Sequence, residues 1–214
     1  MIRYIKISEL VLIGIIFPIC VIYFELAKYL LFFIWGAFIY ALLVYFVFYK
    51  EKIKLIDLFS LKFNFSKKEF YTVTFRWLVL SVFLYLLTLY FFPQNLFALF
   101  KRDPALMYLV LVFYPILSAF PQEFIFCTFF FNRYQSLFKT EYSIVFMSAV
   151  IFCLAHVFFI NWVAPLLSAV GGLMFANTYR RTNSLLLVSF EHALYGNTLF
   201  FIGLGWFFWG GSVS

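Results

Sequence analysis

The chain has 214 residues, of which 66% are hydrophobic and only 12% are charged, and its mean hydropathy is +1.01. A soluble domain is about half apolar and a quarter charged, because its surface has to meet water. The composition therefore excludes a soluble globular protein and indicates one embedded in a membrane. The net charge of +7 comes from basic residues scattered between apolar segments, which excludes a nucleic-acid-binding patch.

The apolar segments follow one another with short polar gaps, and each is long enough to cross a bilayer. A spanning helix needs roughly 20 mostly apolar residues. Pro121 breaks one long segment and glycines can break the last, so the expected fold class is all-α, a polytopic transmembrane helix bundle of about seven or eight spans. The first segment has no small-residue cleavage site after it and is expected to remain as a span. In chain order the segments are 8–23, 29–49, 71–92, 105–131, 143–159, 162–179 and 184–209.

One long polar stretch, residues 50–69, interrupts this pattern, and no soluble domain or internal repeat is visible. We expect N-terminal transmembrane helices over 1–104, including this basic loop, and a core over 105–214. A cytoplasmic N-terminus puts twelve of the 16 basic residues on the inside, as the positive-inside rule favours. These are Arg3, Lys6, Lys50, Lys52, Lys54, Lys62, Lys67, Lys68, Arg133, Lys139, Arg180 and Arg181.

The sequence thus predicts a multi-pass protein of the cell membrane with its N-terminus in the cytoplasm. Frequent Phe, Ile, Lys and Tyr hint at an AT-rich bacterial genome, which makes the bacterial inner membrane the expected location.

Few ionisable groups lie inside the expected spans. Such groups cost about 2.5–3.5 kcal/mol each on insertion, so they normally face the bundle interior and have a function. Glu123, His156, Glu191 and His192 lie in the C-terminal spans, and Arg76 lies near the start of the third. A carboxylate, two imidazoles and an amide are together the groups needed to activate a water and to stabilise an oxyanion.

Three short motifs contain most of these residues, in a fixed order. They are Gln122-Glu123-Phe124-Ile125-Phe126-Cys127, then Phe152-Cys153-Leu154-Ala155-His156, then His192-Ala193-Leu194-Tyr195-Gly196-Asn197. The pattern resembles the CAAX protease and bacteriocin-processing family, also called the Abi family, which includes the type II CAAX prenyl endopeptidase. Its motifs are Glu-Glu-x-x-x-Arg, Phe-x-x-x-His, and His-x-x-x-Asn or Asp, and each is weak alone but specific in combination.

The resemblance implies an all-helical intramembrane peptidase that acts through a water activated by glutamate and histidine. By resemblance, Glu123 is the base together with His156, while His192 and Asn197 support the oxyanion and Gln122 can hold the water. Some family members are described as metal-dependent. A divalent metal, if used, would be held by His156, His192 and Glu123.

The chain departs from the family pattern at three positions. Gln122 stands where the usual glutamate base is found, and an amide cannot take a proton at neutral pH. Cys127 replaces the arginine that pairs with the carboxylates, and Arg133, six residues on, is an uncertain substitute. Asn197 follows His192 by five residues rather than four, which turns it away from the histidine face of an ideal helix.

Three functions remain open on the sequence. The first is an active peptidase whose partners are membrane lipid and a membrane-associated or lipidated peptide or protein substrate. The second is a degenerate family member that serves as a membrane binding or assembly partner, and the third is a transporter or proton relay. Glu191 is a secondary candidate for the base, although a packing role is favoured because it lies about 100° around the helix from His192.

Overall fold

The computed structural model describes residues 2–48 and 65–209, and most of the predicted basic loop 50–69 lies outside them. Within these two ranges the chain is helical, with turns and no strand, so the all-α class is confirmed. Six helical runs are long and apolar enough to cross a membrane. They are Arg3–Tyr23, Leu26–Phe48, Lys67–Phe91, Pro104–Leu137, Glu141–Phe159 and Leu185–Ile202.

The expected span at 162–179 is present as α11 (Val163–Thr182), 20 residues long, although it is not among the six most apolar runs. Its polar last turns, with Asn177, Arg180 and Arg181, account for the lower hydropathy. The other expected spans each correspond to one helical run, and the last ends at Gly203, whose φ of 97° is favourable only for glycine. The chain is therefore a multi-pass membrane protein.

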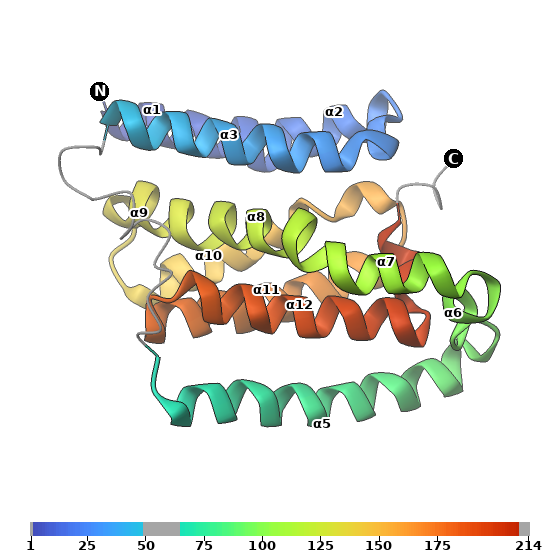
Figure 1. The fold of residues 1–214 in the computed structure, drawn as a ribbon. Helices are drawn as coiled ribbons and strands as arrows, with labels where there is room; N and C mark the ends of the chain where they lie inside the picture. The colour runs from blue at the N-terminus through green and yellow to red at the C-terminus, as the bar shows by residue number, and fades with distance from the viewer. Residues whose placement is uncertain (1, 49–64, 210–214) are drawn as a thin grey trace.

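The helices form three groups (Figure 1). One group is the hairpin of α1 (Ile2–Val11), α2 (Phe17–Tyr23) and α3 (Leu30–Phe48), and the opposite side is covered by α5 (Lys67–Phe91). Between them lie α7 to α12, with the short α6 (Ala98–Arg102) leading into them. The inner elements are α7 (Pro104–Tyr114), α8 (Phe120–Glu123), α9 (Phe130–Tyr134), α10 (Glu141–Leu154), α11 and α12 (Leu185–Ile202).

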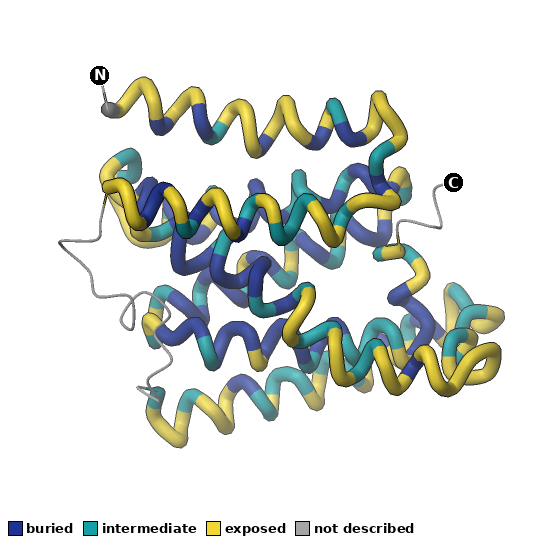
Figure 2. Tube along the Cα trace, turned by 45° about the horizontal axis from the view of Figure 1, so that its top comes forward, coloured by how far each residue is buried: buried dark blue, intermediate teal, exposed yellow. Residues whose placement is uncertain are grey.

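Burial follows this arrangement (Figure 2). The hairpin, α5 and α7 are exposed along their outer faces, whereas α8, α10 and α12 are largely buried. Large apolar side chains such as Phe32, Phe75 and Tyr90 are at least 70% exposed. In a bilayer these faces meet lipid, which explains how the chain tolerates so much exposed apolar surface. The predicted division at residue 104/105 stays a prediction.

A buried ion pair joins the hairpin to the inner helices. Arg133 donates from Nε and Nη2 to Oε2 of Glu9, at 3.0 and 2.8 Å, and the Tyr40 hydroxyl donates to Oε1 of Glu9 at 2.9 Å. Both charged side chains are 7% exposed. Glu9 was not predicted from the sequence as an intramembrane group, because it lies close to the start of its apolar segment.

A second ion pair joins α5 to the inner helices. The guanidinium of Arg76 pairs with Glu191 of α12 and donates to Thr178 Oγ1 of α11 at 2.9 Å. The next residue, Trp77, donates from Nε1 to Thr198 Oγ1, about two turns along α12 from Glu191, at 2.9 Å. Glu191 thus contacts the helix that covers α12, which agrees with the packing role favoured from the sequence.

Candidate active site

The first motif lies in an irregular part of the fourth membrane-crossing run. The short α8 is flanked by π-helical turns at Pro115–Ala119 and Phe124–Phe129. Such wide turns inside helices are frequent at functional sites, and prolines favour them because they cannot donate to the helical ladder. Pro121 has no N–H for the carbonyl of Leu117, and the indole of Trp35 donates to that oxygen instead, at 3.1 Å. The distortion is therefore compensated by the hairpin, and it presents Gln122 and Glu123 to the interior.

Glu123 and His192 form the centre of the polar cluster. Nδ1 of His192 donates to Oε1 of Glu123 at 2.7 Å, and Nε2 of the same ring lies 2.9 Å from the hydroxyl of Tyr114. Glu123 is completely buried. Because a carboxylate only accepts, its contact fixes a proton on Nδ1 and holds the imidazole in one orientation. The contacts join the first and third motifs across α8 and α12.

Cys127 occupies the place of the family arginine and also contacts Glu123. Its Sγ donates to Oε2 of Glu123 at 3.1 Å. Both oxygens of the carboxylate therefore have partners, and neither partner is an arginine or a lysine. Arg133 pairs with Glu9, so the sequence hypothesis that it substitutes for the motif arginine is wrong.

His156 stands at the end of α10, with one ring nitrogen fixed. Nδ1 lies 2.7 Å from the carbonyl oxygen of Phe152, so it must carry the proton and donate. Nε2 is then an unprotonated acceptor, and it has no hydrogen-bond partner among the residues that the structure describes. The Phe152 ring lies beside both imidazoles, with centroids 4.6 Å from that of His156 and 5.7 Å from that of His192. The second motif thus presents a basic nitrogen close to the other two motifs.

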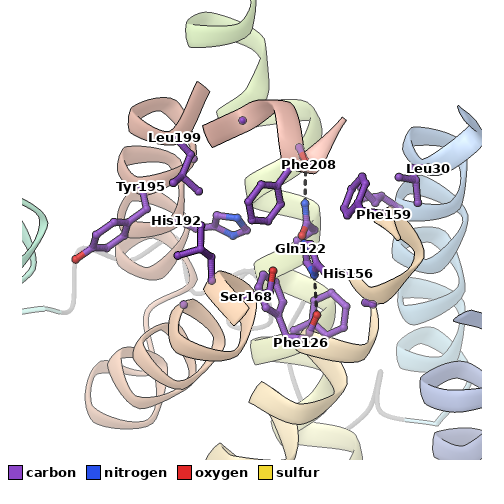
Figure 3. Close-up of a pocket in the computed structure, with 18 of the residues that line it drawn as sticks. Leu30, Gln122, Phe126, His156, Phe159, Ser168, His192, Tyr195, Leu199 and Phe208 are labelled. Carbon is purple, nitrogen blue, oxygen red and sulfur yellow. Dashed lines mark hydrogen bonds between the residues drawn. The ribbon is translucent and has the colours of Figure 1, made fainter. Parts of the chain in front are cut away.

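A cavity of about 850 Å³ brings these groups together (Figure 3). Its wall is mostly aromatic and aliphatic, and His156, His192 and Gln122 are on it, from three different helical segments. Glu123 and Asn197 do not line it. The remaining polar side chains on its inner wall are Tyr114, Ser118, Ser168 and Tyr195.

Gln122 faces the cavity with a fixed amide. Its Nε2 donates to the hydroxyl of Ser118 at 2.8 Å, one helical turn earlier. With Nε2 in this contact, Oε1 is the remaining acceptor, and no described residue donates to it. The glutamine is therefore arranged to accept a hydrogen bond from a molecule in the cavity.

Asn197 has a different position from the one that the motif implies. Its Nδ2 donates to the carbonyl oxygen of Leu111 at 3.1 Å. Pro115 lies four residues after Leu111 and has no N–H, so it cannot donate to this carbonyl as another helical residue would. Oδ1 of Asn197 is buried and has no partner in the described ranges. The five-residue spacing and the unbroken helix α12 keep this side chain off the cavity wall, so the structure gives Asn197 a packing contact.

Gly196 allows the close approach of Tyr114 to His192. A Cβ atom built on Gly196 overlaps the Tyr114 ring, whereas one built on Gly36 of α3 meets nothing within 4 Å. We expect Gly196→Ala to lower the free energy of unfolding by about 1–3 kcal/mol, because the ring has to move. Gly36→Ala, the matched control, should change it by about 1 kcal/mol or less, in the stabilising direction. Thermal unfolding in detergent measures both, and equal unfolding temperatures for the two variants would contradict the packing account.

The donor set does not fit a metal ion held by His156, His192 and Glu123. Glu123 and His192 are hydrogen-bonded to each other, and the second nitrogen of His192 contacts Tyr114, so Nε2 of His156 is the one imidazole nitrogen of this set without a partner among the described residues, and Glu123 does not line the cavity. In the described ranges no three His, Cys, Asp or Glu side chains are grouped to hold a metal. We therefore derive no step through a metal.

Two cavity residues that contact the motif residues were not found from the sequence. Tyr114 and Ser118 precede the first motif, and neither belongs to a motif. Tyr114 is one of 15 tyrosines and Ser118 is an isolated hydroxyl in an apolar run, so no sequence signal separates them from packing residues. Their roles follow only from the contacts to His192 and Gln122.

Comparison with known proteins agrees with this geometry. Residues 104–198 match the family described as type II CAAX prenyl endopeptidase Rce1-like. No curated protein and no solved structure matches the chain. The matched segment begins at the start of α7, ends within α12 and includes all three motifs. Residues 104–198, slightly less than half of the chain, are therefore similar to this family of proteases, as the motifs predicted.

Proposed function

We propose that the chain is an intramembrane peptidase that hydrolyses a peptide bond of a membrane-associated or lipidated substrate. The observation that carries the proposal is the wall of one cavity, where the free Nε2 of His156, the amide of Gln122 and the Glu123-bound His192 meet. A largely apolar cavity with a few convergent polar groups is typical of a substrate site.

In the proposed reaction His156 is the general base. A water placed between Nε2 of His156 and Oε1 of Gln122 donates one hydrogen to each, which leaves an oxygen lone pair for attack on the carbonyl carbon. His156 takes the proton as the C–O bond forms. It returns the proton to the leaving amine as the C–N bond breaks, so the products are a carboxylic acid and an amine.

Tyr114 and His192 support the oxyanion in this proposal. A proton on both nitrogens of His192 makes Nε2 a donor to the tyrosine oxygen, and the tyrosine O–H is then free to donate to the carbonyl oxygen. Glu123, which has no access to the cavity, orients His192 and balances its charge. In this proposal Glu123 is a positioning residue and not the base, because it does not line the cavity and its two oxygens accept hydrogen bonds from His192 and Cys127.

The test is the appearance of new peptide termini. The full chain in lipid vesicles is mixed with membrane proteins of cells that lack it, and mass spectrometry compares the termini formed with the wild type and with a His156→Asn, His192→Phe double variant. The proposal expects termini that require the wild type. Identical sets of termini would contradict it and favour the non-catalytic membrane partner, which the replacements at Gln122 and Cys127 also support.

A further inference from the structure

The two ends of the bundle differ in charge. At one end, where α1, α5 and α12 begin and α3 and α11 finish, lie Arg3, Lys67, Lys139, Arg180 and Arg181. The sequence that connects α3 to α5 contains four further lysines. We call this the basic end. The opposite end carries three basic residues, Lys28, Lys101 and Arg102, next to Glu25 and Asp103. Basic segments of membrane proteins remain in the cytoplasm, so the basic end is predicted to be the cytoplasmic one.

The cavity lies in the half of the bundle away from the basic end. On α5, which begins at Lys67, its first lining residue is Leu80, and on α12, which begins at Leu185, it is His192. At 1.5 Å per helical residue, the first roughly 20 Å of α5 lie outside the cavity. At the opposite end, by contrast, the connections between helices contribute Lys28, Phe158, Phe159, Phe208 and Trp209 to its wall.

The rim of the cavity is apolar and exposed. Leu31 of α3, Phe83 of α5 and Leu166 of α11 all line the cavity and are 47%, 57% and 54% exposed. Lys28, between α2 and α3, is the single Lys, Arg, Asp or Glu among the lining residues of the described chain, and it is exposed at the edge. An apolar chain can therefore enter from the hydrocarbon, with its polar part near Lys28.

We infer that the cavity is entered from the non-cytoplasmic half of the membrane, and that its occupant is a peptide held in that leaflet by an apolar segment. That the occupant is a peptide rests on the proposed function. The side of the membrane from which it enters is inferred from the difference in charge between the two ends of the bundle. The cleaved bond then lies on the non-cytoplasmic side of the membrane midplane, so the substrate is translocated before it is cut. A reaction that exports or inserts the peptide must precede this one.

The test is the side from which cysteines can be labelled. In spheroplasts that contain the full chain, Lys28→Cys at the rim and Ser168→Cys in the cavity are treated with a small membrane-impermeant methanethiosulfonate, before and after permeabilisation. The matched controls are Arg181→Cys at the basic end and Ser189→Cys; Ser189 is also buried, at 7% exposed against 3% for Ser168, but does not line the cavity. The unmodified chain, with Cys20, Cys127 and Cys153, gives the background.

The inference expects Lys28→Cys and Ser168→Cys to react fully in intact spheroplasts. Arg181→Cys should react only after permeabilisation, and Ser189→Cys should stay at background in both. Reaction of Lys28→Cys or Ser168→Cys only after permeabilisation would overturn the inference. Labelling does not depend on hydrolysis. The labelling result can therefore be interpreted even if the test of new termini contradicts the peptidase activity, and the test of new termini does not depend on the side of labelling.

Discussion

His156→Asn is expected to lower the rate of peptide hydrolysis by about 10²–10⁴-fold, the usual contribution of a general base. The asparagine amide can still donate to the carbonyl of Phe152, as Nδ1 does now, but it has no equivalent of Nε2. The variant therefore removes the proton acceptor with little change in local packing. The rate is measured with a peptide identified from its new termini, with the variant reconstituted in the same vesicles as the wild type.

The control for this experiment is Gln135→Glu, an exposed side chain that follows α9 and does not line the cavity. This substitution changes an amide to a carboxylate at the surface of the protein and leaves the cavity wall unaltered. We expect its rate to stay near that of the wild type. A His156→Asn protein that unfolds at the wild-type temperature and retains the wild-type rate would remove His156 from the reaction.

Glu9→Gln is expected to lower the free energy of unfolding by about 3–5 kcal/mol, because it removes the buried carboxylate that pairs with the charge of Arg133. The carboxylate now accepts two bonds from Arg133 and one from Tyr40, and so ties α1, α3 and α9 together. Thermal unfolding or denaturant titration in detergent measures the change. Glu9, Tyr40 and Arg133 do not line the cavity, so the remaining folded protein should keep its rate of hydrolysis.

Glu141→Gln serves as the matched control for the ion pair. Glu141 pairs with Arg180 at 3.1 Å, but its side chain is 70% exposed. Exposed pairs contribute about 0–1 kcal/mol, so this variant should be close to the wild type. If Glu9→Gln were as stable as Glu141→Gln, the hairpin would not depend on the buried pair for its attachment.

The sequence predicted the fold well, because hydropathy and helix length are properties of each segment by itself. The spans around Leu10, Phe75 and Val150 appear where the apolar runs place them. The sequence also indicated which of the ionisable groups, namely His156 and His192, would be brought to one place, since their motifs carry the order and spacing of a known family.

The exact position of each side chain could not be predicted in the same way. Two π-helical turns around α8 decide that Gln122 lines the cavity while Glu123 lies behind His192, and their placement depends on contacts such as that of Trp35. Asn197 belongs to a motif, yet it donates to the carbonyl of Leu111. Pairs distant in sequence, such as Glu9 with Arg133, follow from helix packing and have no local signal.

Hydrolysis in water enriched in ¹⁸O tests the central claim most directly. If the chain cuts peptide bonds with an activated water, each new C-terminal carboxylate formed by the wild type carries one ¹⁸O atom from the solvent, and the His156→Asn protein forms such termini at least about a hundredfold more slowly. Peptides with that label in equal amounts from both proteins, or from neither, would contradict the account of the cavity as a hydrolytic site.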